Sequence, residues 1–126
     1  MRILIVDDDK IVTDQFDFYL SKNHKITTFN SSMHALTYFK CNHNFDVIIT
    51  DFLMPNLRGD ELIDKILEIK TDQRFIVISG YFKSEFADTL KKYGADIRMI
   101  DKPVDLLDLE CALDLIENKV PNCLTY

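Results

Sequence analysis

The 126-residue sequence predicts an α/β fold built around a parallel sheet. Short runs rich in β-branched residues alternate five times with stretches of helical periodicity, which is typical of parallel βα units rather than of hairpins. Two of these runs, Ile3 to Val6 and Val47 to Ile49, are apolar at every position. Strands in the middle of a parallel sheet have this composition because helices cover both of their faces. We therefore expect one doubly wound domain.

Strands and helices are expected to follow one another along the chain. The strands are placed at residues 2–7, 25–29, 46–50, 75–79 and 97–100. Between and after them, apolar side chains recur at three- and four-residue intervals, so that each set shares one face of a helix and is expected in the core. These sets are Val12, Phe16, Tyr19 and Leu20; Ala35, Leu36 and Phe39; Leu62, Ile63, Ile66 and Leu67; Phe86, Ala87 and Leu90; and Leu109, Ala112, Leu113 and Ile116.

Capping residues are expected at the ends of several helices. Asp9, Ser31 or Ser32, and Asp105 precede the first, second and fifth helices. Their side-chain oxygens can accept hydrogen bonds from the free backbone N–H groups at a helix start. Gly94 is expected to end the fourth helix, because glycine readily adopts the left-handed conformation that terminates helices.

Composition and charge exclude several classes of protein. Fifteen basic and 21 acidic residues give a net charge of −6, which repels nucleic-acid backbones, so we expect no direct nucleic-acid binding. The apolar runs are too short for membrane insertion, and the N-terminus lacks the layout of a signal peptide, so we expect a soluble, cytoplasmic protein. Three widely spaced cysteines, Cys41, Cys111 and Cys123, favour reduced thiols over a disulfide framework or a zinc site.

Polar side chains follow four of the five predicted strands. In an open parallel α/β sheet, ligands bind outside the carboxyl ends of the strands, where these side chains would gather. They are Asp7, Asp8 and Asp9; Asp51; Ser79; and Lys102. The strand at 25–29 ends instead with Phe29 and Asn30, and we expect it at the sheet edge, away from the site.

Converging carboxylates repel one another unless a cation lies among them, and Mg²⁺ is the natural choice because it prefers oxygen ligands. An Asp beside that ion can attack a phosphoryl group, while a lysine and a hydroxyl hold the transferred oxygens. An Asp after a strand is also a common helix N-cap; this role fits Asp9, and for Asp8 taken alone it fits as well as a role in the site does. Asp51 does not fit, because Pro55 prevents a helix from starting directly after it.

Four segments together resemble the receiver domain of bacterial two-component response regulators, the CheY-like superfamily. They are ILIVDDD near the start, DVIITDFLMPNLRGDEL around Asp51, FIVISG around Ser79, and DKP at 101–103. Their order and spacing are specific where each motif alone would be weak. The resemblance covers residues 1–118 and leaves 119–126 as a short C-terminal tail. It implies a flavodoxin-like (βα)5 sheet of strand order 2-1-3-4-5.

The resemblance also implies roles for residues of the site. Asp51 corresponds to the phosphoacceptor. Asp7, Asp8 and Asp51 correspond to the carboxylate ligands of Mg²⁺, and Leu53 to the residue that gives its backbone carbonyl to the ion. The chain would thus be a phosphoprotein that accepts a phosphoryl group and loses it by self-dephosphorylation, without turnover of an external substrate.

The switch residues follow the family pattern with two departures. Ser79 corresponds to the switch hydroxyl that binds the phosphoryl group, Lys102 to the family's lysine, and the bond from Lys102 to Pro103 to a cis peptide. Receivers usually have Tyr or Phe three residues before that lysine, where this chain has Met99. The segment from Gly94 to Lys102 is one residue longer than the common pattern. We hypothesise that the flexible Met99 still changes rotamer on phosphorylation.

Partners are implied by the resemblance alone. Upstream they are a histidine kinase or a His-containing phosphotransfer domain. Downstream they are an effector protein, or an output domain if the chain is part of a longer regulator. The fourth helix, fifth strand and fifth helix form the usual face for downstream contact or homodimerisation.

Two other classes of function remain open from the sequence. Asp7-Asp8-Asp9 after an apolar strand also resembles the nucleophile motif of haloacid-dehalogenase-type phosphatases, although this interpretation gives Asp51 no role. Met99 favours a receiver-like binding module that works without phosphorylation. A flavin site is disfavoured, because the loop after the first strand presents three acids where a phosphate would bind.

Overall fold

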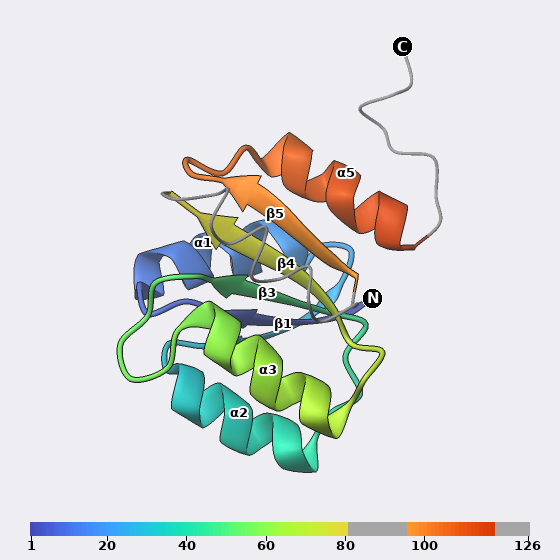
Figure 1. Ribbon diagram of the computed structural model, residues 1–126. Helices are drawn as coiled ribbons and strands as arrows, with labels where there is room; N and C mark the ends of the chain where they lie inside the picture. The colour runs from blue at the N-terminus through green and yellow to red at the C-terminus, as the bar shows by residue number, and fades with distance from the viewer. Residues whose placement is uncertain (81–95, 118–126) are drawn as a thin grey trace.

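The computed structural model describes residues 1–80 and 96–117. Five parallel strands form one sheet in the order β2-β1-β3-β4-β5, with helices on both faces (Figure 1). The predicted strand order is therefore confirmed. The elements are β1 (Arg2–Val6), α1 (Lys10–Leu20), β2 (Lys25–Phe29), α2 (Ser32–Cys41), β3 (Val47–Asp51), α3 (Gly59–Ile69), β4 (Arg74–Ser79), β5 (Ile97–Asp101) and α5 (Leu106–Ile116).

The core lies in two layers, one on each face of the sheet. Helices α2 and α3 pack on one face and α1 and α5 on the other (Figure 1). Alternate residues of the central strands serve the two layers, so Leu4 and Ile48 face one layer while Ile3 and Ile49 face the other. All four of these side chains are at most 1% exposed. Burial on both faces explains why these strands lack the polar alternation of a solvated sheet.

The helix starts follow the capping chemistry that the sequence predicts. The carboxylates of Asp9 and Asp105 accept from the N–H groups of Ile11 and Leu107 at 2.9 and 2.8 Å. Ser31, rather than Ser32, is the cap of α2. The bounds of β2 are as predicted, and each of the other four strands differs from its prediction by one residue at one end or at both; β1, for example, ends before Asp7, and β3 extends through Asp51.

Some predictions lie outside the described residues. These are the fourth helix with its face of Phe86, Ala87 and Leu90, its end at Gly94, and the tail at 119–126. Within the described part of the chain, no helix has both the length and the apolar character needed to cross a bilayer.

The cysteines differ from the prediction of reduced thiols. Cys41 is free and exposed, but Cys111 is disulfide-bonded, so the prediction is wrong for Cys111. Spacing along the sequence could not show this, because a disulfide depends on how closely the chain brings two Cα atoms in space.

The start of α3 packs directly on the backbone that follows β3. The N–H of Gly59 donates to the carbonyl of Phe52 at 2.8 Å. A Cβ at Gly59 would lie 2.6 Å from the carbonyl oxygen of Asp51 and 3.0 Å from the Cα of Phe52. Both neighbours are backbone atoms, so they cannot move aside without displacing the end of β3. Glycine is needed here for close approach rather than for an unusual dihedral angle.

We predict that Gly59→Ala lowers the free energy of unfolding by about 1–3 kcal/mol, because the new methyl group forces α3 away from the end of β3. The matched control is Gly80→Ala. There a Cβ would lie 3.6 Å from the Lys102 side chain, which is an ordinary contact. We therefore expect Gly80→Ala to lower the free energy of unfolding by less than about 1 kcal/mol. Urea unfolding of both variants measures the difference. Equal effects at the two glycines would contradict the prediction.

Candidate functional site

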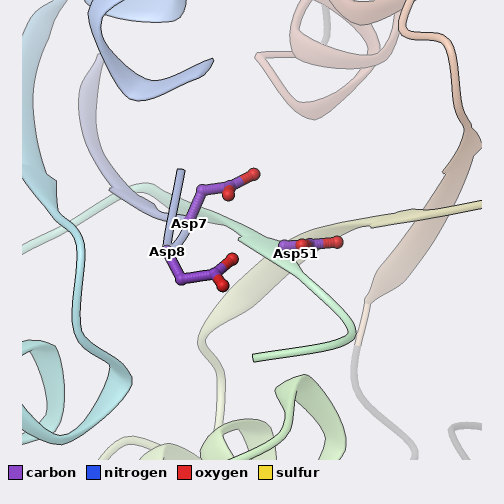
Figure 2. Close-up of side chains that lie close together, drawn as sticks. All are labelled: Asp7, Asp8 and Asp51. Atoms are coloured by element: carbon purple, nitrogen blue, oxygen red, sulfur yellow. The ribbon is translucent and has the colours of Figure 1, made fainter. Parts of the chain in front are cut away.

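The register of the central strands brings three acids together. Val6 of β1 pairs with Thr50 of β3, so Asp7 and Asp8 emerge beside Asp51 at the carboxyl edge of the sheet. Carboxylate oxygens of the three residues lie within 4.8 Å of one another. Figure 2 shows the three side chains gathered where β1 and β3 end. The predicted convergence of these residues is therefore confirmed.

Two of the three acids are buried. Asp7 and Asp51 are 3% and 6% exposed, while Asp8 is exposed. Burial is the main reason that the pKa of the Asp7 carboxyl rises from 3.8 to about 6; the nearby Asp51 contributes to this rise, and the hydrogen bond from the Asp9 N–H opposes it. Burial also raises the pKa of Asp51, while Lys102 opposes this. Both shifts show mainly that burying these charged carboxylates is costly, and the repulsion between neighbouring acids adds to that cost.

Asp51 is held by groups that favour its charged form. Its Oδ1 accepts from the Phe52 N–H at 2.9 Å and lies 3.1 Å from the Lys102 Nζ. The loop that follows is anchored in the core by the buried side chains of Phe52, Met54 and Leu57. The side chain of Leu53, in contrast, is 56% exposed. Asp51 is therefore fixed in place before any ligand arrives.

Ser79 and Lys102 come from the ends of β4 and β5. The N–H of Lys102 donates to the carbonyl of Ser79 at 2.9 Å, which ties the two residues together through the backbone. Ser79 is buried, and the Lys102–Pro103 peptide bond is cis, as the resemblance implies. The stem of Lys102 passes over Gly80, which leaves room for it. The hydroxyl thus comes from β4, the strand next to that of Asp51, and the ammonium reaches Asp51 from the end of β5, one strand further along the sheet.

Met99 lies in the middle of β5, opposite Val77 of β4. It is half-buried and packs against the core layer that contains α2 and α3. Ser79 pairs with Asp101 two positions further along the same two strands. Met99 is therefore on the strand next to Ser79, which is the position that the switch hypothesis needs.

One polar group beside the acids was not predicted from the sequence. Asn30, which follows β2, donates from its side-chain amide to the Asp7 carbonyl and to the Thr13 hydroxyl, at 2.9 Å each. β2 is an edge strand as predicted, but the expectation that its end lies away from the site is wrong for Asn30. The signal was available, because β2 is expected beside β1 and Asn30 then comes level with Asp7.

The acids fit a hard divalent cation by the chemistry of their donors. Three carboxylates that share one edge offer oxygen ligands only, which suits Mg²⁺, an ion that keeps several waters and uses few protein groups. Lys102 is a single positive charge facing this cluster and leaves it net negative. The excess of negative charge is what a bound cation would offset.

Comparison with known proteins identifies the family. The family model of the response regulator receiver domain matches residues 3–114. The transcriptional regulatory protein FixJ of Rhizobium meliloti is 31% identical over 80% of this chain, which covers 49% of FixJ. The DNA-binding transcriptional regulator NtrC of Azospirillum brasilense is 34% identical over 85% of this chain, which covers 22% of NtrC. The chain thus spans half or less of the length of these relatives.

Solved structures agree with this assignment. A response regulator receiver domain protein of Clostridium thermocellum is 31% identical, with a TM-score of 0.85 over 93% of this chain and 94% of that one. The CheX–CheY–BeF3–Mg²⁺ complex of Borrelia burgdorferi contains a chain that is 25% identical, with a TM-score of 0.83 over 93% of this chain and 89% of that one. The protein belongs to the response regulator receiver domain family.

We predict that Asp7→Asn stabilises the metal-free protein at pH 7. In the wild type the folded-state pKa exceeds the unfolded one, so the favourable contribution of Asp7 is complete below about pH 4 and is lost as the pH rises through about 6. Asparagine carries no charge, so the variant should gain about 1–3 kcal/mol at pH 7 and little at pH 4.

Thermal unfolding in chelator at both pH values measures this effect. The control is Asp64→Asn, at an exposed position on α3, which should change the free energy of unfolding by less than about 0.5 kcal/mol. A gain for Asp7→Asn of the same size at pH 4 and pH 7 would contradict the assigned origin of the pKa shift.

Proposed function

We propose that this chain is a phosphoacceptor receiver domain in which Asp51 takes a phosphoryl group in a Mg²⁺-dependent reaction. The donor is a histidine kinase or a His-containing phosphotransfer domain. The observation that carries the proposal is the meeting of three carboxylates and one lysine at the carboxyl edge of the sheet. Membership of the receiver family supports this function over a phosphatase or a phosphorylation-independent module.

The proposed metal ligands are the carboxylates of Asp7, Asp8 and Asp51 and the backbone carbonyl of Leu53. When bound, Mg²⁺ would neutralise the clustered charge and hold a phosphoryl oxygen. The Borrelia burgdorferi complex, which contains Mg²⁺ and BeF3, supports the assignment by similarity.

In the proposed transfer, a carboxylate oxygen of Asp51 attacks phosphorus while the bond from phosphorus to the donor's imidazole nitrogen breaks. The electron pair of that bond stays on the imidazole. The Lys102 ammonium and the Phe52 N–H stabilise the charged carboxylate that must attack. We assign Lys102 and the Ser79 hydroxyl to contacts with the transferred phosphoryl oxygens.

We further propose that phosphorylation changes a protein-interaction surface through Ser79 and Met99. The downstream face would use β5 and α5, together with the predicted fourth helix. Homodimerisation through this face also stays a prediction. The domain is proposed to span 1–118 and to act without turnover of an external substrate. FixJ and NtrC are named as transcriptional regulators and extend well beyond the matched region, so an output domain or an effector protein is the proposed recipient of the signal.

We expect wild-type protein incubated with acetyl phosphate and Mg²⁺ to gain the mass of one phosphoryl group. Asp51→Asn should gain none, because the amide is a far weaker nucleophile, and chelation of Mg²⁺ should abolish the gain in the wild type. Intact-protein mass spectrometry measures both results.

The matched control is Asp64→Asn, which should be phosphorylated like the wild type. Failure of the wild type to gain mass would overturn the proposed function. A gain that survives Asp51→Asn would move the nucleophile to Asp7 and support the phosphatase alternative.

We expect the Met99 methyl signal to shift when the phosphoryl mimic beryllofluoride is added with Mg²⁺. The physical reason is that a hydroxyl drawn toward the mimic leaves space beside β5, which the flexible Met99 side chain can fill. Methyl NMR measures the shift, with Met99→Leu for assignment. Met33, exposed on α2, is the internal control and should stay unchanged. An unchanged Met99 methyl signal in protein that has bound the mimic would contradict the hypothesis that Met99 changes rotamer on phosphorylation.

A further inference from the structure

The loop between β1 and α1 carries two of the three clustered acids and is only three residues long, Asp7 to Asp9. Its first residue extends the sheet, since the Asp7 N–H donates to the Phe29 carbonyl at 3.1 Å. The Asp7 carboxylate accepts from the Asp9 N–H at 2.9 Å, and Asp9 in turn caps α1. The position of the Asp7 and Asp8 carboxylates therefore depends on how firmly both ends of this loop are held.

One amide group reaches both ends of the loop. The Asn30 Nδ2 lies 2.9 Å from the Asp7 carbonyl oxygen. A carbonyl oxygen can only accept, so the atom facing it is the amide nitrogen. Because β2 ends at Phe29, the side chain of Asn30 takes the place of the next hydrogen bond in the ladder between β1 and β2.

The same nitrogen lies 2.9 Å from the Thr13 hydroxyl. Thr13 is 1% exposed, and its hydroxyl donates to the Lys10 carbonyl in the first turn of α1 at 3.1 Å. Both hydrogens of the Asn30 amide are thus used. One is donated to the Asp7 carbonyl directly after β1, and the other to the Thr13 hydroxyl near the start of α1. The two ends of the acid-bearing loop are joined through a single side chain.

We propose that Asn30 and Thr13 are positioning residues for the Mg²⁺ site and hold the Asp7–Asp8 loop in place against the repulsion of the clustered carboxylates. This inference rests on the proposed function. Neither residue supplies a carboxylate to the cluster, and both act through the backbone on either side of it. Neutral hydrogen bonds suit this task, because they hold the loop without adding charge to an already negative site.

The test compares Mg²⁺ affinity, measured by isothermal titration calorimetry, in four variants. Asn30→Ala removes the amide, and Thr13→Val removes the hydroxyl at nearly constant volume. We expect about 10-fold weaker binding in each, the range typical of groups that orient metal ligands. Thr13→Ser restores the hydroxyl and should return the affinity to within about twofold of the wild type. Asn44→Ala, at an exposed position before β3, is the matched control and should bind like the wild type.

Phosphorylation by acetyl phosphate separates positioning from general damage. In Asn30→Ala and Thr13→Val, the rate at low Mg²⁺ should fall by about 10-fold and recover at saturating Mg²⁺, because Asp51 itself is unaffected. Amide hydrogen exchange adds a readout that needs no metal. The Asp9 N–H should exchange about fivefold faster in these two variants, and its exchange rate should be unchanged in Thr13→Ser and Asn44→Ala.

The outcomes distinguish this inference from the function on which it rests. Suppose that the wild type binds Mg²⁺ and is phosphorylated. Unchanged Mg²⁺ affinity and unchanged Asp9 N–H exchange in Asn30→Ala and Thr13→Val would then overturn the positioning role alone. A lower thermal midpoint with unchanged Mg²⁺ affinity would show that the two residues have a purely structural role, and it would also overturn the positioning role. A wild type that neither binds Mg²⁺ nor gains a phosphoryl group would overturn the proposed function, whatever the exchange data show.

Discussion

The repulsion among Asp7, Asp8 and Asp51 is the constraint on which the rest of the site depends. Parallel pairing of β1 with β3 places their carboxylates within 4.8 Å of one another, and the burial of two of them removes much of the water that would screen their charges. Burial is the main cause of the raised pKa values of Asp7 and Asp51, and the neighbouring carboxylates add to it. A bound cation would offset the negative charge that the protein has already gathered here, whereas an anionic group could approach these carboxylates only after such a cation is in place.

The scaffold meets this repulsion with rigid elements and short anchored loops. The central strands are buried on both faces, so they cannot shift sideways to relieve the strain without disrupting two core layers. Buried side chains hold the loop after Asp51, and α3 approaches the end of β3 closely enough that only glycine fits at its first residue. On the other side, the hydrogen bonds of Asn30 tie the loop after β1 to α1. Each of these contacts fixes the backbone and does not pair with a carboxylate, so the carboxylate oxygens remain available to a ligand.

The neighbouring strands connect the acids to a distant surface. Ser79 and Lys102 end β4 and β5, are joined by a backbone hydrogen bond, and stand beside Asp51. Met99 lies further back on β5, packed on the core. A displacement of Ser79 would therefore reach β5 through the pairing of β4 with β5. This chain spans half or less of the length of FixJ and NtrC.

The sequence by itself determined the fold class, the strand order through its resemblance, and the acids, serine and lysine that gather at one edge of the sheet. It could do so because periodicity and strand-end residues are local signals, and the edge at which parallel strands end is a property of the fold class. The tertiary structure alone decided the close approach at Gly59, the disulfide at Cys111 and the contact of Asn30 with Asp7. Each of these depends on distances between segments far apart in the chain, which are set by packing and register rather than by residue type.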